Sequence, residues 1–380
     1  MGAYLDHNAT TPLDMRVLAE MLPYMQWQHG NASSLHQHGR IARQAVERAR
    51  EQVAALVGAH PAEVIFTSGG TEANNLAIAG FHALHKSVPV LCSAVEHASV
   101  LEPVMRCHRG SARTLPVDEA GRVRMTELIN TLAGKQHLVA VMMANNETGV
   151  VQDIEAVSAV VRDSRSWLHC DAVQAAGKMV VDFRRSGAHM MSLSAHKLLG
   201  PKGIGALIRD RSVPLAPILN GGDQESGLRA GTENVAAIVG FGKAAELAGQ
   251  ELAMRQNRMM LLRDRLEYRL REIPAVRIFG VSTNRLCNTV CFAVPGIEGE
   301  SLLMMLDEQQ FAVSSGSACH SMRHEPSHVL LAMGVDTETA RRAIRVSVGP
   351  DSEAVEIDEF VDCLRGLVNN GANAMASAWA

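Results

Sequence analysis

Two residues of this 380-residue chain have the types and surroundings of nucleophiles with different roles. Lys197 lies in Ser-Ala-His-Lys-Leu-Leu-Gly-Pro-Lys-Gly, on a polar turn that follows an apolar, strand-like run. Cys319 lies in Ser-Ser-Gly-Ser-Ala-Cys-His, a loop of small residues with little to pack. A lysine amine can form a Schiff base with an aldehyde cofactor, and a mobile thiol can attack or carry sulfur. The pair therefore predicts cofactor chemistry at Lys197 and thiol chemistry at Cys319.

Two segments upstream of Lys197 have the pattern of a binding site for a phosphorylated pyridine cofactor. In residues 67–71 (Thr-Ser-Gly-Gly-Thr) a strand enters a glycine turn and a helix begins, so free N–H groups and the helix dipole can cradle a phosphate. The alternative is an ordinary strand-to-helix turn capped by Thr71. Asp171 ends a strand, where an acid can keep a pyridine nitrogen protonated, and Gln174 could reach the ring oxygen. The alternative for Asp171 is a helix N-cap.

Three further positions are candidates for the same site. Ser194 and His196 flank the lysine turn and could contact phosphate, whereas the alternative for Lys197 is a surface lysine after a strand. The turn at 229–232 (Arg-Ala-Gly-Thr) could supply another phosphate donor. Arg345, flanked by apolar residues in a strand, needs an anionic partner, which is either a substrate carboxylate or a structural Asp or Glu.

Helical patterns and apolar strands alternate through the first two thirds of the chain. Helices are expected from an N-cap at Asp14 to about Gln28, over 38–57, from Glu72 and over 153–163, and strands at 64–66, 88–92, 138–144, 167–170, 190–193 and 205–208. This alternation predicts an α/β fold with a doubly wound, mostly parallel sheet.

The last third of the chain has a different pattern. A long helical stretch, 232–271, bridges to short strands (289–294, 311–314, 343–348) and amphipathic helices (300–308, 352–368), and 369–373 are expected to fray. This pattern predicts a smaller α+β domain. We expect residues 14–250 to form the large domain, and 1–13 with 251–380 to form the small domain that carries the Cys319 loop.

Composition excludes several classes of protein. Hydrophobic residues make up 47% of the chain and the net charge is −4, which argues against a nucleic-acid or anionic-membrane surface. There is no apolar run long enough to span a membrane and no signal-peptide pattern. The seven cysteines are scattered, so a reducing cytoplasm fits better than a disulfide framework, and Cys92, Cys170 and Cys291 are expected to be small buried hydrophobic residues. No metal site is expected.

The order and joint presence of these motifs resemble the class V aminotransferase group of fold-type I pyridoxal-phosphate enzymes, and most closely the group I, NifS/IscS-type cysteine desulfurases. The matching segments span residues 4 to about 350: 4–11 (YLDHNATT), 30–34 (GNASS), 68–72 (SGGTE), 96–97 (EH), 145–149 (NNETG), 171–174 (DAVQ), 196–197 (HK), 229–234 (RAGTEN), 314–319 (SSGSAC) and 325–328 (EPSH).

The resemblance implies a role for each candidate residue. Lys197 carries pyridoxal 5'-phosphate, His97 stacks on its ring and acts in proton transfer, and Cys319 accepts the sulfur. The remaining roles are phosphate binding by Gly70, Thr71, Ser194, His196 and, from the other subunit of a homodimer, Thr232; pairing of Asp171 with the pyridine nitrogen and of Gln174 with the ring oxygen; and placement of cofactor or substrate by Asn146, Asn31 and Arg345.

The implied reaction converts L-cysteine into L-alanine and a persulfide on Cys319, which passes sulfur to an acceptor protein such as an iron–sulfur scaffold. No metal is resident, although Cys319 would transiently contact a cluster on that scaffold. Iron–sulfur assembly, tRNA thiolation and DNA modification all remain open as the pathway. A selenocysteine lyase, another class V enzyme and a non-enzymatic scaffold are the alternatives, and intact Lys197, Asp171, His97 and Cys319 argue against the scaffold.

The sequence departs from its relatives immediately after Cys319. It reads His320-Ser321-Met322-Arg323-His324, where relatives usually carry small hydroxyl residues. The cationic side chains could favour the thiolate, or they could form an exposed face specific for a partner.

Overall fold

The structure is a computed structural model that describes residues 2–107, 113–315 and 325–378. The large sheet has the strand order β2-β8-β7-β6-β5-β3-β4. Its strands are β2 (Val64–Thr67), β3 (Val90–Ser93), β4 (Arg113–Leu115), β5 (Leu138–Ala140), β6 (Trp167–Asp171), β7 (Met190–Ser194) and β8 (Gly205–Arg209). Adjacent strands from β7 to β4 are parallel, and β8 is antiparallel to both of its neighbours. The predicted mostly parallel sheet is confirmed.

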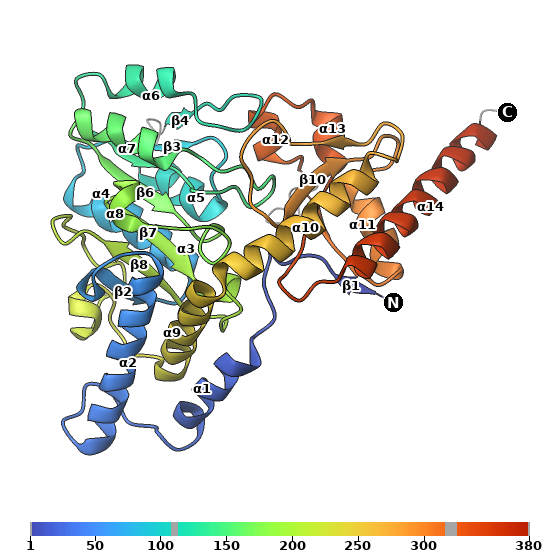
Figure 1. Ribbon diagram of the computed structural model, residues 1–380. Helices are drawn as coiled ribbons and strands as arrows, with labels where there is room; N and C mark the ends of the chain where they lie inside the picture. The colour runs from blue at the N-terminus through green and yellow to red at the C-terminus, as the bar shows by residue number, and fades with distance from the viewer. Residues whose placement is uncertain (1, 108–112, 316–324, 379–380) are drawn as a thin grey trace.

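Helices cover both faces of this sheet because successive residues of each strand point to opposite faces. In β8, Ala206 and Ile208 join one buried cluster with helices α2 and α9, whereas Leu207 joins another with α3 and α5. Figure 1 shows these layers. The helices of this region are α1 (Met15–Gln26), α2 (Gln37–Leu56), η1 (Pro61–Glu63), α3 (Gly70–Asn75), the π-helix η2 (Leu76–Gly80), α4 (Phe81–Leu84), α5 (Ala98–Cys107), α6 (Met125–Leu132), α7 (Ile154–Asp163), α8 (Phe183–Ser186), η3 (Ala195–Lys197), η4 (Gln224–Gly227) and α9 (Val235–Gln250).

A second sheet has the order β12-β13-β10-β9 and is antiparallel, while β1 pairs with β11 in parallel. The elements of this part are β1 (Ala3–Tyr4), α10 (Leu252–Leu270), β9 (Arg277–Ile278), β10 (Thr289–Ala293), α11 (Gly299–Glu308), β11 (Phe311–Ala312), β12 (Ser314–Ser315), α12 (His328–Ala332), α13 (Thr337–Arg341), β13 (Ala343–Ser347) and α14 (Ala354–Ala378). A third hydrophobic cluster combines Ala3 and Leu5 with residues between 259 and 364.

The predicted domain boundaries stay a prediction. Although the third cluster joins the two ends of the chain, Phe279, Leu286 and Cys291 pack into the first cluster instead. The two parts therefore share buried surface, and the side-chain clusters do not follow a single break in the sequence.

Some expected elements differ from the structure. The strand predicted over 138–144 stops at Ala140, and the helical stretch predicted over 232–271 is two helices that meet at Glu251. The strand predicted at 311–314 is two short strands, because Phe311–Ala312 pairs with β1 and Ser314–Ser315 pairs with β13. The fraying predicted at 369–373 is wrong, since α14 continues to Ala378 and extends away from the body in Figure 1.

Replacement of Phe292 by alanine should strongly destabilise the second sheet. Phe292 lies on β10, is fully buried in the third cluster and would leave a large cavity, so Phe292→Ala should lower the free energy of unfolding by about 3–5 kcal/mol. Urea unfolding followed by circular dichroism measures the loss. Leu261→Ala on α10, where the side chain is 70% exposed, is the control and should change stability by no more than about 0.5 kcal/mol. Equal effects of the two substitutions would contradict this assignment of the core.

Candidate active site

The loops after the parallel strands bring the candidate residues to one edge of the large sheet. Thr71 follows β2, His97 follows β3, Asn146 follows β5, Asp171 ends β6 and Lys197 follows β7. These strands share one direction, so their carboxyl ends meet at the same edge, where ligands bind in open α/β folds. The topology therefore assembles a site from positions 126 residues apart in the sequence, between Thr71 and Lys197.

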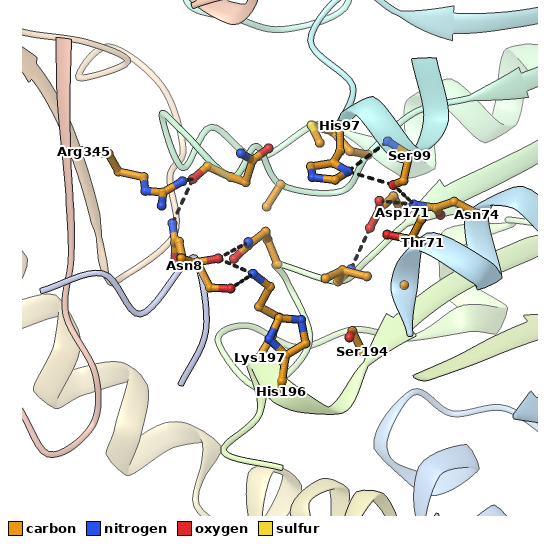
Figure 2. Close-up of a pocket in the computed structure, with 17 residues that line it drawn as sticks. Asn8, Thr71, Asn74, His97, Ser99, Asp171, Ser194, His196, Lys197 and Arg345 are labelled. Atoms are coloured by element: carbon orange, nitrogen blue, oxygen red, sulfur yellow. Dashed lines mark hydrogen bonds between the residues drawn. The ribbon is translucent and has the colours of Figure 1, made fainter. Parts of the chain in front are cut away.

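The candidate residues line one cavity of about 340 Å³. In Figure 2, Arg345 and Asn8 lie on one side of it, and Thr71, Asn74 and Asp171 lie on the other. The lining residues are Asn8, Ala9, Gly70, Thr71, Asn74, His97, Ser99, Met142, Ala144, Asn146, Asp171, Val173, Gln174, Ser194, His196, Lys197 and Arg345.

One end of the cavity has the shape and donors of an anion cradle. A Cβ atom at Gly70 would lie 2.8 Å from Cγ2 of Val173, so only glycine lets the helix start approach this turn. The Ser194 hydroxyl is buried and has no hydrogen-bond partner within the described part of the chain. Unpaired buried hydroxyls are costly, so this group is a natural donor to a bound anion. The Glu72 carboxylate binds Arg229 at 3.0 Å and thereby ties the turn at 229–232 to the helix start.

A hydrogen-bonded chain connects Asp171 to His97. Asn74 Nδ2 donates to Asp171 Oδ2 at 2.7 Å and to Ser99 Oγ at 2.8 Å, and Ser99 Oγ lies 2.8 Å from His97 Nδ1. The Ser99 backbone N–H also donates to His97 Nδ1 at 3.1 Å, so a neutral His97 ring carries its proton on Nε2. The second carboxylate oxygen of Asp171 accepts from the Val173 N–H at 3.0 Å. Both groups are thus held in one orientation.

Lys197 lies on the short helix η3 and is held against the N-terminal segment. Its Nζ atom donates to the carbonyl oxygen of Asn8 and, at 2.6 Å, to that of Ala9. Thr11 holds the same turn in place, because its N–H and its hydroxyl both donate to the His196 carbonyl, at 3.0 and 2.8 Å. Figure 2 shows the lysine pointing into the cavity beside Asn8.

His196 is electrostatically disfavoured as a cation. Burial, followed by the charges of Lys197, Lys202 and Lys178, lowers the pKa of His196 to about 4. Its Nδ1 atom lies 3.1 Å from the Thr10 hydroxyl. At neutral pH the ring is uncharged, so it can serve as a hydrogen-bond partner and not as a counter-ion.

Gln174 and Arg345 are both tied to the N-terminal segment. Gln174 Nε2 donates to the Asn8 carbonyl at 2.9 Å. Arg345 donates to Asp6 Oδ1 at 2.6 Å and to the Asn146 carbonyl at 3.1 Å, so the structural acid considered for Arg345 is present. Its buried Nε atom has no partner among the described residues, which leaves one donor for a ligand. The arginine therefore combines a structural ion pair with a place in the cavity wall.

Two predicted residues that the structure describes do not line this cavity. Asn31 and Thr232 are exposed and do not line it. Cys319 lies outside the described residues, as do the departures at His320, Arg323 and His324.

The segments that flank Cys319 are anchored to the site. On the N-terminal side, Ser314 in β12 pairs with Arg345 in β13. On the C-terminal side, Ser327 Oγ donates to Glu147 Oε2 at 2.5 Å, and His328 Nε2 lies 2.9 Å from the Glu96 carbonyl oxygen. Burial raises the pKa of Glu147 to about 7.

Sequence reasoning missed several polar residues of the site. Asn8 was part of a recognised motif but was given no role, and Asn74, Ser99 and Lys178 were not singled out. Asn74 is 1% exposed and Lys178 is 5% exposed, which is unusual for such polar groups. In the sequence, only their positions could have indicated a role: Asn74 follows the glycine turn at 69–70, and Lys178 lies four residues after Gln174.

Comparisons with known proteins identify the family. The Aminotransferase class-V profile matches residues 3–360. The chain belongs to the class V aminotransferase family. Within that family it groups with the NifS/IscS-type cysteine desulfurases. It is 42% identical to "Cysteine desulfurase IscS" of Dictyoglomus turgidum over 96% of this chain and 94% of that protein.

Solved structures agree with this grouping. A structure described as a NifS-like protein superposes with a TM-score of 0.91 at 35% identity, covering 97% of this chain and all of the other. SspA in complex with cysteine superposes with a TM-score of 0.80 at 32% identity, covering 91% of this chain and 99% of the other. The fold-type I architecture expected from the sequence is confirmed.

The described residues contain neither a membrane-spanning helix nor a metal-binding cluster. None of the helices there is long and apolar enough to cross a bilayer. Within the same residues, no group of three or more His, Cys, Asp or Glu side chains could hold a metal ion. Cys92, Cys170 and Cys291 are buried and unpaired, as predicted.

The buried carboxyl of Glu96, next to His97, should make stability fall as pH rises. Burial raises its pKa from 4.5 to about 8, although Ser93 and the Met142 N–H donate to it. The folded protein then holds a proton that the unfolded chain releases, so this contribution is complete below pH 4.5 and is lost as pH rises through about 8. Glu96→Gln should remove much of this fall, on the order of a few kcal/mol between pH 5 and 8.

Urea unfolding of wild type and variant at both pH values measures the difference. Burial also raises the pKa of Glu147, so Glu147 should cause a fall of stability with rising pH in both proteins. Glu102→Gln, at a side chain that is 66% exposed, is the matched control and should leave the pH dependence unchanged. A wild-type slope preserved in Glu96→Gln would show that Glu96 is ionised in the folded protein.

Proposed function

We propose that this protein is a pyridoxal 5'-phosphate-dependent cysteine desulfurase that converts L-cysteine to L-alanine and leaves a persulfide on Cys319. The observation that carries the proposal is the convergence of Lys197, Asp171, His97 and Ser194 on one cavity in a chain of this family. A solved relative is a complex with cysteine, which supports the choice of substrate.

The described residues fit the cofactor. The unpaired buried Ser194 hydroxyl and the glycine turn at Gly70, with Thr71 and His196, suit its phosphate. Asp171 is oriented by two donors and suits the pyridine nitrogen, which a carboxylate keeps protonated. The remaining contacts would be His97 over the ring, Gln174 at the ring oxygen and Asn146 at the substrate side.

The bound cofactor supplies an aldehyde that captures amino groups and a ring that withdraws electrons from the substrate Cα. Lys197, which the Asn8 and Ala9 carbonyls hold in the cavity, carries the cofactor and then takes the proton from Cα as a free amine. Arg345, with its free Nε donor, would hold the substrate carboxylate, whereas Asn31 does not line the cavity of the single chain.

The sulfur step belongs to Cys319. Its thiolate attacks the sulfur of the bound cysteine, the Cβ–S bond breaks, and a proton is added at Cβ to give alanine. The chain keeps the sulfur as a Cys319 persulfide, so one thiol is consumed for each alanine released. An acceptor protein then takes the outer sulfur. Iron–sulfur cluster assembly is the proposed destination, in line with the name of an IscS relative.

We also propose a cytoplasmic homodimer in which Thr232 completes the partner's phosphate site. Thr232 is exposed in the single chain and does not line the cavity, although Arg229 in the same turn is tied to Glu72 at the phosphate end. An exposed donor at this place suits a ligand held across a subunit boundary.

Two substitutions should separate the two nucleophiles. Lys197→Ala should abolish both turnover and the visible absorbance of the cofactor, because the lysine holds the cofactor covalently. Cys319→Ser should keep the absorbance and lose protein-bound persulfide. Alanine release, persulfide labelling and visible spectra measure these outcomes. Normal persulfide formation in Cys319→Ser would overturn the assignment of the sulfur acceptor.

Mixed dimers should test the contribution of Thr232. A heterodimer of a Lys197→Ala subunit and a Thr232→Ala subunit contains one intact site only if Thr232 acts across the interface. Desulfurase activity should then recover to about half of the wild-type value, well above either homodimer. Mixed dimers no more active than the Thr232→Ala homodimer would place Thr232 in the site of its own chain.

A further inference from the structure

Lys178 is a buried lysine that the proposed reaction does not use. It is 5% exposed and lies four residues after Gln174, in the tight turn that follows β6. Its Nζ atom donates to Gln174 Oε1 at 2.7 Å and to Asn8 Oδ1 at 3.1 Å. Among the described residues it has no carboxylate partner, which is rare for a buried lysine.

A lysine ammonium donates hydrogen bonds and accepts none, so it determines which way its amide partners face. Gln174 must present its oxygen to Lys178, and its nitrogen is thereby directed to the Asn8 carbonyl and the cavity. Asn8 must likewise present its oxygen, which also accepts from Asn288 at 3.0 Å. Its nitrogen then donates to the Asn146 carbonyl at 3.1 Å and to Thr289 at 2.8 Å.

These two amides are connected to the groups that face the cavity. The Asn8 carbonyl accepts from both Lys197 and Gln174, and the Asn8 amide nitrogen holds the backbone of Asn146. The side-chain hydrogen bonds of Lys178 within the described part of the chain therefore reach the cavity lining through Gln174 and Asn8. A reversed amide at either position would place a donor against the ammonium. The Gln174 amide would lose two hydrogen bonds, and the Asn8 amide would also lose its matches to Asn288, Asn146 and Thr289.

The surroundings of Lys178 are strongly basic. Burial, followed by the charge of Lys197, lowers the pKa of Lys178 to about 7, while Cys287 opposes and Arg345 adds to this effect. Lys178 in turn lowers the pKa of His7 and of His196, both to about 4, after burial as the main cause. Two carboxylates of this region act on other groups, since the charge of Asp351 opposes the lowering of the pKa of His7 and Asp6 pairs with Arg345.

We propose that Lys178 is a positioning residue that sets the amide orientations of Gln174 and Asn8 and so decides which hydrogen-bond donors face the cofactor cavity. The proposal rests on the proposed function for what occupies the cavity. The orientation itself is a property of the chain and can be tested without cofactor.

The first test uses the full-length protein loaded with pyridoxal 5'-phosphate. Lys178→Met removes the donor and the charge at nearly constant volume. The substitution removes the constraint that directs the Gln174 donor to the ring oxygen, and it removes a nearby positive charge. Both changes favour the protonated form of the cofactor bound to Lys197. The midpoint of the visible absorbance change with pH should therefore rise by about one unit, and the rise should be much smaller in a Gln174→Ala background. Lys243→Met, which removes the α9 lysine paired with Glu246 at 2.8 Å, is the control and should not move the midpoint.

An unchanged midpoint in folded, loaded Lys178→Met would overturn the proposal. An equal rise with and without Gln174 would overturn it as well, since the lysine would then act through charge alone. Failure of the wild type to bind pyridoxal 5'-phosphate would refute the proposed function and leave the orientation to the second test.

The second test measures urea unfolding of the cofactor-free protein. Gln174→Glu keeps an acceptor facing Lys178 and loses only the donor to the Asn8 carbonyl, so its loss of stability should be moderate. Gln174→Glu combined with Lys178→Met buries a carboxylate without its partner and should unfold at markedly lower urea than the sum of the single effects predicts. Independent effects of the two substitutions would show that Lys178 does not face the Gln174 oxygen, and would overturn the proposal.

Discussion

The site depends on the contacts that hold residues 6–11 between the two sheets. On one side, the His7 N–H donates to the carbonyl of Ser347, the last residue of β13, at 3.1 Å. On the other, Thr11 holds the lysine turn through the His196 carbonyl, and the Asn8 and Ala9 carbonyls hold Lys197. Because this short segment makes both sets of contacts, a shift of the second sheet would move the lysine relative to the rest of the cavity. The N-terminal segment thus forms part of the cavity and also connects the second sheet to the lysine turn.

The position of this segment also determines which charged side chains lie together at the cavity. Lys197, Lys178 and Arg345 bring positive charge to one place, whereas His7 and His196 have pKa values near 4 and stay neutral. The histidines can therefore exchange hydrogen bonds at physiological pH without adding to the repulsion. Such a site favours anions, in agreement with a phosphorylated cofactor and a substrate carboxylate.

Much of this arrangement could be predicted from sequence, since strand ends and glycine turns reveal which residues meet at the sheet edge. Asp171, Lys197 and Gly70 were found in this way, and the family resemblance added His97 and Asn146. Lys178 and Asn74 were not found, because a single sequence does not distinguish a buried polar residue from a surface one. The boundary between helices α9 and α10 at Glu251 was not predicted because no proline marks it. The division of residues 311–315 into two strands was not predicted because it depends on which strands they pair with, and a hydrophobic run does not specify its partners. The role proposed for Thr232 across a subunit interface rests on resemblance, as does the role of Cys319, which lies outside the described residues.

The anchors that flank Cys319 have a consequence for how such enzymes diverge. Ser314 is paired with the strand of Arg345, and Ser327 and His328 are bonded to the segments that carry Asn146 and His97. The described residues of the cavity wall are joined to these attachment points by contacts of their own. Sequence change at His320 and Arg323 therefore leaves those contacts untouched. The contacts that shape the described cavity and the residues next to the proposed sulfur acceptor are thus encoded in separate parts of the chain.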